Sequence, residues 1–447
     1  MPKRNLLLLC LMTAIGLVSW LARDRSQHGR RFGEVMAAIE RLYLEPVDEA
    51  SLFRAAMTGV FSKLDEHSAF IDGEQRQALE AALNQEFGGV GLELAIDARD
   101  GTLTVESPVV GSPAWRVGIA VGDKIIAIDG ATTRGMKVGD AVALLRGPVG
   151  RGVTLEIAGE AGSHEVSLVR ETVRTESVLG DRRLSDGSWD WFIEGESGIA
   201  FIRLTGFGER TLKDLDGSLE AIQASQSTRG IILDLRGNPG GLLSVAIDVC
   251  DRFLDDGIIV STRGRARVSS QQKGVAAVDL LNTHRATQGV ACAGVPMAVL
   301  IDGLTASAGE IVAACLQDNH RAHVVGSRSF GKGTVQSILP LLDGESLLKL
   351  TTSEYLRPSS ANIHRAAADA DDAVWGVSPD RGHEITPTAE TLGGVMAWRK
   401  ARDVVLKSGD SGAMPVASQT VAQLPRSIDP VLAKAIEAIL DHNGVSD

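Results

Sequence analysis

The chain has 447 residues, a length that predicts about two to four domains. Hydrophobic residues make up 44% of it and aromatic residues only 4%, which is typical of a globular protein rich in small and aliphatic side chains. The formal net charge of −12 argues against nucleic acid as the main partner.

The N-terminus has the pattern of an export signal. Two basic residues precede 17 uncharged residues, 6–22, a run at the lower edge of the roughly 17–25 residues that span a bilayer. Because Trp20 and Leu21 stand where a cleavage site needs small residues, we expect residues 1–25 to be an uncleaved signal anchor, with a removed signal peptide as the alternative. The protein would then be exported to the periplasmic side of the cell envelope and anchored in the inner membrane by residues 6–22.

Residues 29–84 predict a small helical domain. Apolar residues recur there at spacings of three and four, which places them on one face of a helix. A further helix is expected at Glu74–Asn84. The two apolar stripes consist of Phe32, Val35, Met36, Ile39 and Leu42, and of Leu52, Ala55, Ala56, Val60, Phe61 and Leu64.

From residue 85 to residue 172 the pattern changes to short strands separated by glycines. One amphipathic helix, expected at residues 137–146, interrupts them. Short strands with a single helix predict a compact β-rich module. The strands are expected at residues 91–96, 102–106, 124–129 and 153–157.

Residues 175–388 alternate between strands and helices, which predicts an α/β domain with functional loops at the strand ends. The polar stretch 359–384 is expected to be an exposed excursion, and a helical C-terminal segment follows at 389–447. Strands are expected at 198–204, 230–235, 257–262, 297–301, 323–326 and 346–352, and helices at 212–225, 242–254, 308–317, 389–405 and 429–441.

Cysteine and histidine give no sign of a metal site. Cys250, Cys292 and Cys315 have no metal-ligand spacing, and the histidines lack the His-Glu-x-x-His pattern of zinc hydrolases. Cys250 and Cys315 fall on apolar helix faces and are expected to be core residues. We therefore expect neither a metal nor a cofactor.

The strongest chemical signal is a serine and a lysine, each placed where a strand meets a tight turn. Ser307 follows an apolar strand and starts an apolar helix, and Lys332 comes 25 positions later between two glycines. A serine hydroxyl attacks as its proton is removed, and a lysine serves as the base if apolar surroundings lower the pKa of its amine. Phe330 and Val335 flank Lys332, and Gln336 is spaced to orient the amine by a hydrogen bond.

Each residue also has a simpler interpretation. Ser307 with Glu310 has the spacing of a helix-capping box, and Lys332 alone would be a surface lysine. Glu310 lies one helical turn from Ser307 on the same face. A carboxylate close to the amine would raise the pKa of the lysine, so we rank Glu310 below Gln336, as an auxiliary residue.

A glycine-rich turn adds to the pair. The strand expected at 230–235 passes into Arg236-Gly-Asn-Pro-Gly-Gly241 and then into a helix, a geometry that leaves backbone N–H groups free to face an oxyanion. An ordinary strand–turn–helix link is the alternative. The segment Gly326–Lys332 matches the spacing of a phosphate-binding loop, but Gly333 stands where such a loop has Ser or Thr, so nucleotide binding is not expected.

Taken together, these residues resemble the C-terminal processing (tail-specific) peptidases, which are PDZ-containing Ser–Lys serine endopeptidases. The resemblance covers nearly the whole chain. It implies a multidomain α/β and β fold with a helical N-terminal region, a PDZ domain at 85–172, an α/β serine protease core of the crotonase-like ββα type at 175–388, and a helical C-terminal segment. The matching segments are Leu304–Glu310 with Lys332 and Gln336, Leu64–Ile71, Phe87–Leu94, Ser112–Ile125, Asp234–Gly241, and Tyr355 with Pro358.

The resemblance implies a role for each site residue. Ser307 would be the nucleophile, Lys332 the general base and Gln336 the residue that orients the base. The oxyanion hole would consist of the backbone amides of Ala308 and Gly240, with Gly241 as the alternative to Gly240. The residues expected to bind the C-terminal carboxylate of a substrate are Gly89, Val90, Gly91 and Leu92.

The implied substrates are proteins or peptides with an apolar C-terminus, which would add as a strand to the PDZ sheet. A homo-oligomer or an adaptor stays open. Arg146 matches a position that couples the PDZ domain to activity in some members, and its alternative is a solvated helix end. Thr305 and Gly309 stand where serine is common in the family, and the segment after Pro358 departs from the family's short hairpin. A catalytically inactive PDZ scaffold is the alternative function.

Overall fold

The computed structural model describes residues 27–97, 99–159, 162–225, 227–265, 279–287, 291–365, 374–404 and 428–444. The expected signal anchor at residues 6–22 lies outside these ranges. Within them, no helix is both long enough and apolar enough to cross a membrane. The chain divides into two compact units, one of residues 1–71 with 338–350 and the other of residues 72–337 with 351–447.

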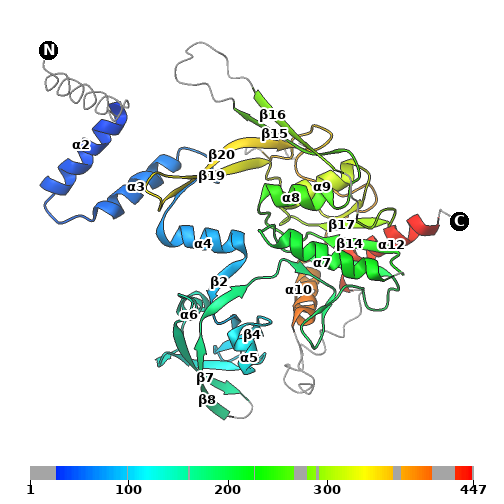
Figure 1. The fold of residues 1–447 in the computed structure, drawn as a ribbon, viewed down its shortest axis with the longest axis horizontal. Helices are drawn as coiled ribbons and strands as arrows, with labels where there is room; N and C mark the ends of the chain where they lie inside the picture. Colours follow the sequence, from blue (N-terminus) through cyan, green and yellow to red (C-terminus); the bar gives the residue numbers. More distant parts are fainter. Residues whose placement is uncertain are drawn as a thin grey trace, which may run out of the picture. The chain divides into compact units, whose positions relative to one another are not determined.

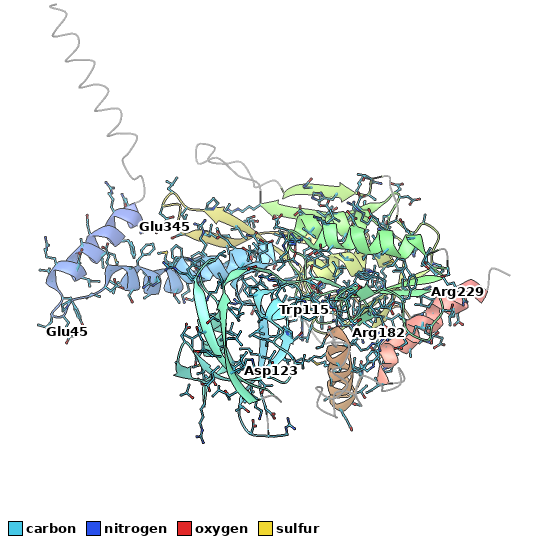
Figure 2. All side chains as sticks on the ribbon, turned by 60° about the horizontal axis from the view of Figure 1, so that its bottom comes forward. Glu45, Trp115, Asp123, Arg182, Arg229 and Glu345 are labelled. Carbon is cyan, nitrogen blue, oxygen red and sulfur yellow. The ribbon has the colours of Figure 1, made fainter. Side chains whose placement is uncertain are left out.

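The first unit contains the two helices expected near the N-terminus and a strand pair of which the sequence pattern predicted only one member, the strand at 346–352. Its helices are α2 (Gln27–Leu42) and α3 (Glu49–Phe61) (Figure 1). Its strand β1 (Ala69–Ile71) pairs antiparallel with residues 347–349 of β20 (Leu347–Leu356). Phe53 of α3 contacts Phe32 and Phe70 edge to face, at centroid distances of 6.4 and 5.6 Å. Glu345, labelled in Figure 2, precedes β20 in this unit.

The second unit begins with α4 and the β-rich module. Its elements are α4 (Gly73–Asn84), β2 (Glu86–Gly89), β3 (Leu92–Ile96), β4 (Leu103–Pro108), α5 (Pro113–Val117), β5 (Lys124–Ile128), β6 (Ala131–Thr132), α6 (Val138–Leu145), β7 (Gly152–Gly159), β8 (Gly162–Val169) and β9 (Glu171–Arg174). The sheet has the order β3-β4-β5-β7-β8, with β6 beside β5, and β2 pairs with β9. The buried side chains of Leu103, Ile125 and Leu155 belong to one core cluster with Ala141 and Leu145 of α6. The four predicted strands and the helix are confirmed.

A parallel sheet forms the centre of the remaining core. Its strands are β10 (Val178–Leu179), β13 (Ile199–Leu204), β14 (Gly230–Asp234), β17 (Met297–Ile301) and β18 (His323–Gly326), in that order, with β10 antiparallel to the rest. The helices are α7 (Thr211–Ala224), α8 (Leu243–Asp251), α9 (Ala308–Asp318), α10 (Ala389–Asp403) and α12 (Pro430–Gly444). The predicted strand–helix alternation is therefore confirmed for this sheet.

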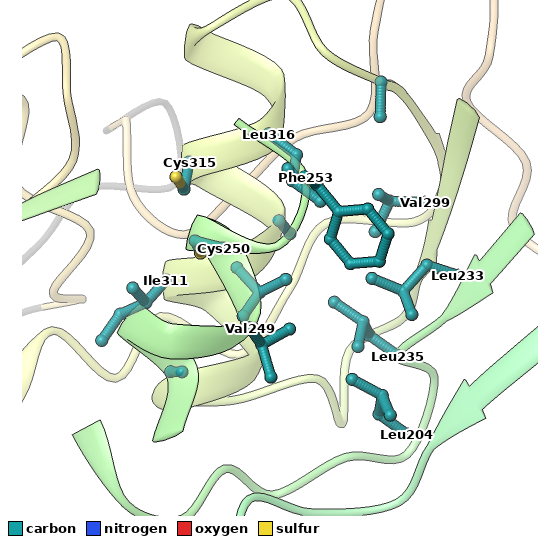
Figure 3. Close-up of a cluster of buried hydrophobic side chains, with 14 of the residues drawn as sticks. Leu204, Leu233, Leu235, Val249, Cys250, Phe253, Val299, Ile311, Cys315 and Leu316 are labelled. Carbon is teal, nitrogen blue, oxygen red and sulfur yellow. The ribbon is translucent and has the colours of Figure 1, made fainter. Parts of the chain in front are cut away.

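Both faces of the parallel sheet are covered by helices. Along β14, Ile231 and Leu233 pack with α7, α8 and α9, whereas Ile232 packs with α10 and α12. This explains why the strand is an unbroken apolar run, because a strand covered on both faces has no polar side. Figure 3 shows Leu233 and Leu235 close to Val249 of α8 in the first of these clusters.

Two segments expected in the α/β alternation form a separate antiparallel arrangement. The strand expected at 257–262 is β15 (Ile258–Arg265), and it pairs with β16 (Asp279–Arg285) and with residues 353–356 of β20. The strand expected at 346–352 is β20, and β19 (Thr334–Pro340), which begins two residues after Lys332, also pairs with it. The sequence pattern identified β15 and β20 as strands but did not show that they belong to a different sheet from β14 and β17.

The expectation of an exposed excursion at 359–384 holds for residues 359–362, which are exposed, and is wrong for single residues on each side of 366–373. Ile363 and Val377 are completely buried, and the Gly376 N–H donates to the Ile363 carbonyl at 2.8 Å. Residues 366–373 lie outside the described ranges. Ile363 and Val377 are isolated apolar residues in a polar stretch and form no periodic pattern. Their burial could therefore not be predicted from the local sequence.

Candidate active site

Ser307 stands at the junction between β17 and α9 in an uncommon backbone conformation. Its φ and ψ are 55° and −115°, outside the regions that non-glycine residues normally occupy. The turn before it is fixed by Thr305, whose hydroxyl donates to the Leu235 carbonyl at 2.9 Å, and by the Ala306 N–H, which donates to the Asn238 carbonyl at 2.9 Å. Such strain persists only where neighbouring contacts hold it, and it is concentrated at functional sites.

Glu310 joins the backbone of the serine to the backbone of the lysine. Its carboxylate is fully buried and accepts the Ser307 N–H and the Lys332 N–H through Oε2, each at 2.8 Å. Through Oε1 it accepts the Ser329 hydroxyl at 2.6 Å and the Gly331 N–H at 2.7 Å. Burial raises the pKa of Glu310, and these four hydrogen bonds oppose that rise because they favour the anion. The expected auxiliary residue is therefore a structural link between the two turns.

Tyr355 makes a second link between the same two residues. Its buried hydroxyl bonds the carbonyl oxygens of Ser307, at 3.2 Å, and of Lys332. Burial, followed by the neighbouring Glu310, raises the pKa of Tyr355, so the phenol stays protonated and able to donate. Glu310 thus binds the amide groups of Ser307 and Lys332, and Tyr355 binds their carbonyl groups.

Gln336 lies on β19, four residues beyond Lys332. Its Nε2 group donates to the hydroxyls of Thr334 at 3.0 Å and Thr351 at 3.2 Å. With the amide nitrogen so occupied, Oε1 is the atom of this side chain that can accept a hydrogen bond from an amine.

The glycine-rich turn approaches Ser307 closely. A Cβ atom at Gly240 would lie 2.7 Å from the Cβ of Ser307 and 3.0 Å from the Ala308 nitrogen, so only glycine fits. The Gly240 N–H donates to Asn238 Oδ1 at 2.8 Å and is therefore occupied. In the described ranges, the N–H groups of Gly241 and Ala308 have no protein acceptor. This arrangement favours Gly241 over Gly240 as the partner of Ala308 in an oxyanion hole.

A buried ion network supports this turn from the other side of the sheet. Arg236, the residue before Gly237, binds Asp234 at 2.9 and 2.7 Å and Asp429, next to α12, at 3.0 Å through two nitrogens. Burial disfavours the ionised form of Asp234, but Arg236 outweighs it and holds the pKa of Asp234 below its usual value. The turn is therefore connected to the C-terminal helix through charged hydrogen bonds.

The residues expected to bind a substrate tail lie in the β-rich module and not at Ser307. Gly89 ends β2, Leu92 begins β3, and Val90 and Gly91 link the two strands. The carbonyls of Val90 and Gly91 accept the N–H groups of Ala114 and Val109, both at 3.0 Å, which fixes the loop. In this part of the structure no described acceptor meets the N–H groups of Val90 and Gly91, so they are available to a carboxylate.

A cavity of about 430 Å³ lies beside this loop. Leu92, Val142 and Leu145 contribute an apolar wall between β3 and α6, and Leu179 and Trp189 line it from the core. Arg146 also lines the cavity, and its guanidinium lies 4.6 Å from the centroid of the Phe87 ring. This contact ties Arg146 to β2 of its own module.

Several residues that hold the site together were not assigned a role from the sequence. In the sequence Tyr355 is only part of a matching motif, and Ser329 and Asp429 have no local signal because their partners lie 19 and 193 positions away. Cys250 and Cys315 are completely buried, as expected of core residues. No group of metal-binding side chains occurs among the described residues.

Comparison with known proteins identifies the family. A model of peptidase family S41 matches residues 198–381, and a PDZ domain model matches residues 104–159. The chain is 35% identical to a carboxy-terminal-processing protease of Bartonella bacilliformis, over 83% of this chain and 81% of that protein. It is 31% identical to the carboxy-terminal processing protease CtpA of Bacillus subtilis (87% and 76%) and 33% identical to a carboxyl-terminal-processing protease of Synechocystis (75% and 74%).

The family models cover the two parts that sequence patterns and structure distinguish, the β-rich module and the α/β core. The relatives match across most of their own length and most of this one. The chain therefore belongs to peptidase family S41 and is a PDZ-containing serine protease of the carboxy-terminal-processing type.

Proposed function

We propose that Ser307 is the nucleophile and Lys332 the general base of an acyl-transfer mechanism. Lys332 takes the proton of the Ser307 hydroxyl as the serine oxygen attacks a peptide carbonyl, and it gives this proton to the amine that leaves. Lys332 then takes a proton from the water that attacks the acyl-enzyme and returns it to Ser307 as the new carboxyl end departs. Gln336 orients the lysine amine through Oε1, the atom not engaged by its donor contacts to Thr334 and Thr351.

The observation that carries this assignment is the double link between the two residues. Glu310 accepts the amides of Ser307 and Lys332, and Tyr355 bonds their carbonyls. Two distant turns are thereby brought together at one place, and a nucleophile must be held within hydrogen-bonding reach of its base. The bond of Glu310 to the Ser307 N–H also completes a helix-capping box, as the spacing predicted. A capping box, however, needs neither the bond of Glu310 to the Lys332 N–H nor the contact of Tyr355 with both carbonyls.

The tetrahedral oxyanion is bound, in this proposal, by the amides of Gly241 and Ala308. Both N–H groups lack an acceptor in the described part of the chain, and Ala308 opens α9, where the helix dipole favours negative charge. Gly240 has a different role in this proposal. Because it has no side chain, the glycine-rich turn can lie close to Ser307, with which a side chain would collide.

Substrates are proteins or peptides whose apolar C-terminus is captured by the PDZ domain. The free N–H groups of Val90 and Gly91 suit a carboxylate, and the apolar wall of Leu92, Val142 and Leu145 suits the last side chain. Arg146 at the rim of this cavity is a candidate for coupling tail binding to cleavage.

The proposal also includes export of the protein and its anchoring in the membrane through residues 6–22. The mass of the mature N-terminus tests this part, because a cleaved signal peptide would be missing from it.

The catalytic assignment is tested with the full chain in detergent micelles and a carboxymethylated, unfolded protein as substrate. Wild type and the exposed-lysine control Lys213→Ala should digest it, whereas Ser307→Ala and Lys332→Ala should lose at least about 1,000-fold in kcat/KM. Digestion by either variant at the wild-type rate would refute the assignment. If wild type itself binds tails but digests nothing, the catalytically inactive PDZ scaffold is the better description.

A further inference from the structure

One carboxylate beside the PDZ cavity has no partner and faces the place where a substrate strand would add. Glu93 lies on β3 directly after the tail-binding loop, and it lines the cavity. The hydrogen bonds and ion pairs of the described residues include none to this side chain. The following inference rests on the proposed capture of C-terminal tails by the PDZ domain.

The edge of the sheet determines which residue of a tail meets Glu93. In the described sheet β3 has a single neighbour, β4, so its other edge can accept a peptide as a new antiparallel strand. If the terminal carboxylate meets the amides of the loop, the last residue lies beside Leu92 and the penultimate residue beside Glu93. Residues opposite each other on one face of a sheet have Cβ atoms about 4.5–5.5 Å apart, within direct contact.

Side chains alternate between the two faces of β3, so the last and the penultimate residue of a bound tail meet different groups. Leu94 is buried in the module, on the side of the cavity's apolar wall, whereas Glu93 is exposed on the opposite face of β3. The last side chain of the tail therefore meets apolar groups, and the penultimate side chain points to the face that carries Glu93. An apolar last residue is compatible with a charged residue before it.

Three of the four cations that line the cavity are paired with carboxylates other than Glu93, and the fourth, Arg146, stacks on Phe87. Arg174 pairs with Glu86 at 3.3 Å, Arg183 pairs with Glu176, and Lys400 pairs with Glu106. Asp403 on α10, a second carboxylate near Glu93 besides Glu106, pairs with Arg203. The Glu93 side chain as a whole is exposed, but the atoms packed around its carboxyl group withdraw that group from water. This burial of the carboxyl, and then the neighbouring Glu106, raise the pKa of Glu93, and the nearby Lys400 and Arg183 do not offset them fully. A cation on the bound ligand would stabilise the ionised Glu93 carboxylate.

We propose that Glu93 selects substrate tails with lysine or arginine at the penultimate position, before an apolar last residue. The primary ammonium of lysine or the guanidinium of arginine would form a charge-assisted hydrogen bond with the Glu93 carboxylate. A tail with an acidic penultimate residue would face repulsion from Glu93 and from Glu106 on β4.

The test measures binding of four peptides to the full chain carrying Ser307→Ala, by fluorescence anisotropy. Three peptides end in the same apolar residue and differ only in a penultimate lysine, glutamine or glutamate, and the fourth is the lysine peptide with an amidated C-terminus. We expect the lysine peptide to bind about fivefold more tightly than the glutamine peptide, and the glutamate peptide about fivefold more weakly. The difference should shrink at high salt.

Substitutions then assign the ranking to Glu93. Glu93→Gln should bind the glutamine peptide as before but no longer distinguish it from the lysine and glutamate peptides, and Glu93→Lys should reverse the order. The control Glu165→Gln makes the same charge change at an exposed position on β8, and it should leave the ranking intact. Equal binding of the three free-acid peptides, or a ranking that persists in Glu93→Gln, would overturn the role of Glu93 alone. Tight binding of the amidated peptide would overturn tail capture itself, and this inference with it.

Discussion

The loops around Ser307 and the edge of the PDZ sheet differ in whether their backbone N–H and C=O groups have hydrogen-bond partners within the protein. At Ser307 and Lys332 the protein supplies the partners, since Glu310 and Tyr355 engage the backbone amides and carbonyls of both residues. At the PDZ edge the described residues leave the N–H groups of Val90 and Gly91 without acceptors. Catalytic groups must be positioned before substrate arrives, whereas a binding edge must keep its hydrogen-bonding groups for the ligand.

This difference predicts that substitutions in the two regions affect different kinetic constants. Changes around the serine and lysine should reduce kcat or stability and leave tail binding unchanged, and changes at the PDZ edge should raise KM. Four substitutions test this separation.

The largest effect is expected for the buried ion pair between Asp429 and Arg236. Asp429→Ala should destabilise the protein by about 3 kcal/mol, because it removes a buried partner of Arg236. Urea unfolding measures the loss. The control Asp441→Ala, at an exposed position on α12, the helix that follows Asp429, should change stability by less than about 0.5 kcal/mol. Equal effects of the two substitutions would mean that the network does not support the core.

Glu310→Gln tests the link between the two catalytic turns. The carboxamide nitrogen cannot accept an N–H bond, so at least one of the four donors loses its acceptor. We expect kcat to fall about 100-fold, which corresponds to about 2.7 kcal/mol, with KM for a tail-bearing substrate within about twofold of wild type. A variant with wild-type kcat would show that the link is dispensable for catalysis.

Gly91→Ala tests the binding edge. Gly91 has a φ of 77°, and a Cβ there would lie 2.2 Å from the Cβ of Ser112, so the loop must deform. Misplaced amides should raise KM about 30-fold, or about 2 kcal/mol, while kcat at saturating substrate is retained. Steady-state kinetics with a peptide of free C-terminus provides the measurement. A fall in kcat alone would contradict the separation of the two regions.

The smallest effect is expected for Tyr355→Phe. It removes the hydroxyl that binds the two carbonyls and leaves the ring, so we expect about a fivefold lower kcat and about 1 kcal/mol lower stability. The chain has one other tyrosine, the exposed Tyr43, and Tyr43→Phe is therefore a matched control that should behave as wild type. If both variants match wild type, Glu310 alone is sufficient to hold the turns.

The sequence predicted local structure and residue chemistry well where the signal was periodic. The helix at 308–317, the strand at 297–301 and the strands of the β-rich module were all confirmed, because burial on one or both faces imposes a period that local sequence records. The matching motifs also identified the family before any contact was known. They did not reveal that Gly240 has its amide occupied by Asn238, since that depends on side-chain direction.

By itself the sequence determined which residues carry chemistry: a serine at a helix start, a lysine between glycines, and a glycine-rich turn. Only the tertiary structure decided how they are held. Glu310 lies three residues from Ser307 but 22 from Lys332, Tyr355 lies 48 from Ser307, and Asp429 lies 193 from Arg236. Hydrogen bonds between such distant residues form only once the strands and helices have packed, so no local pattern of the sequence can contain them.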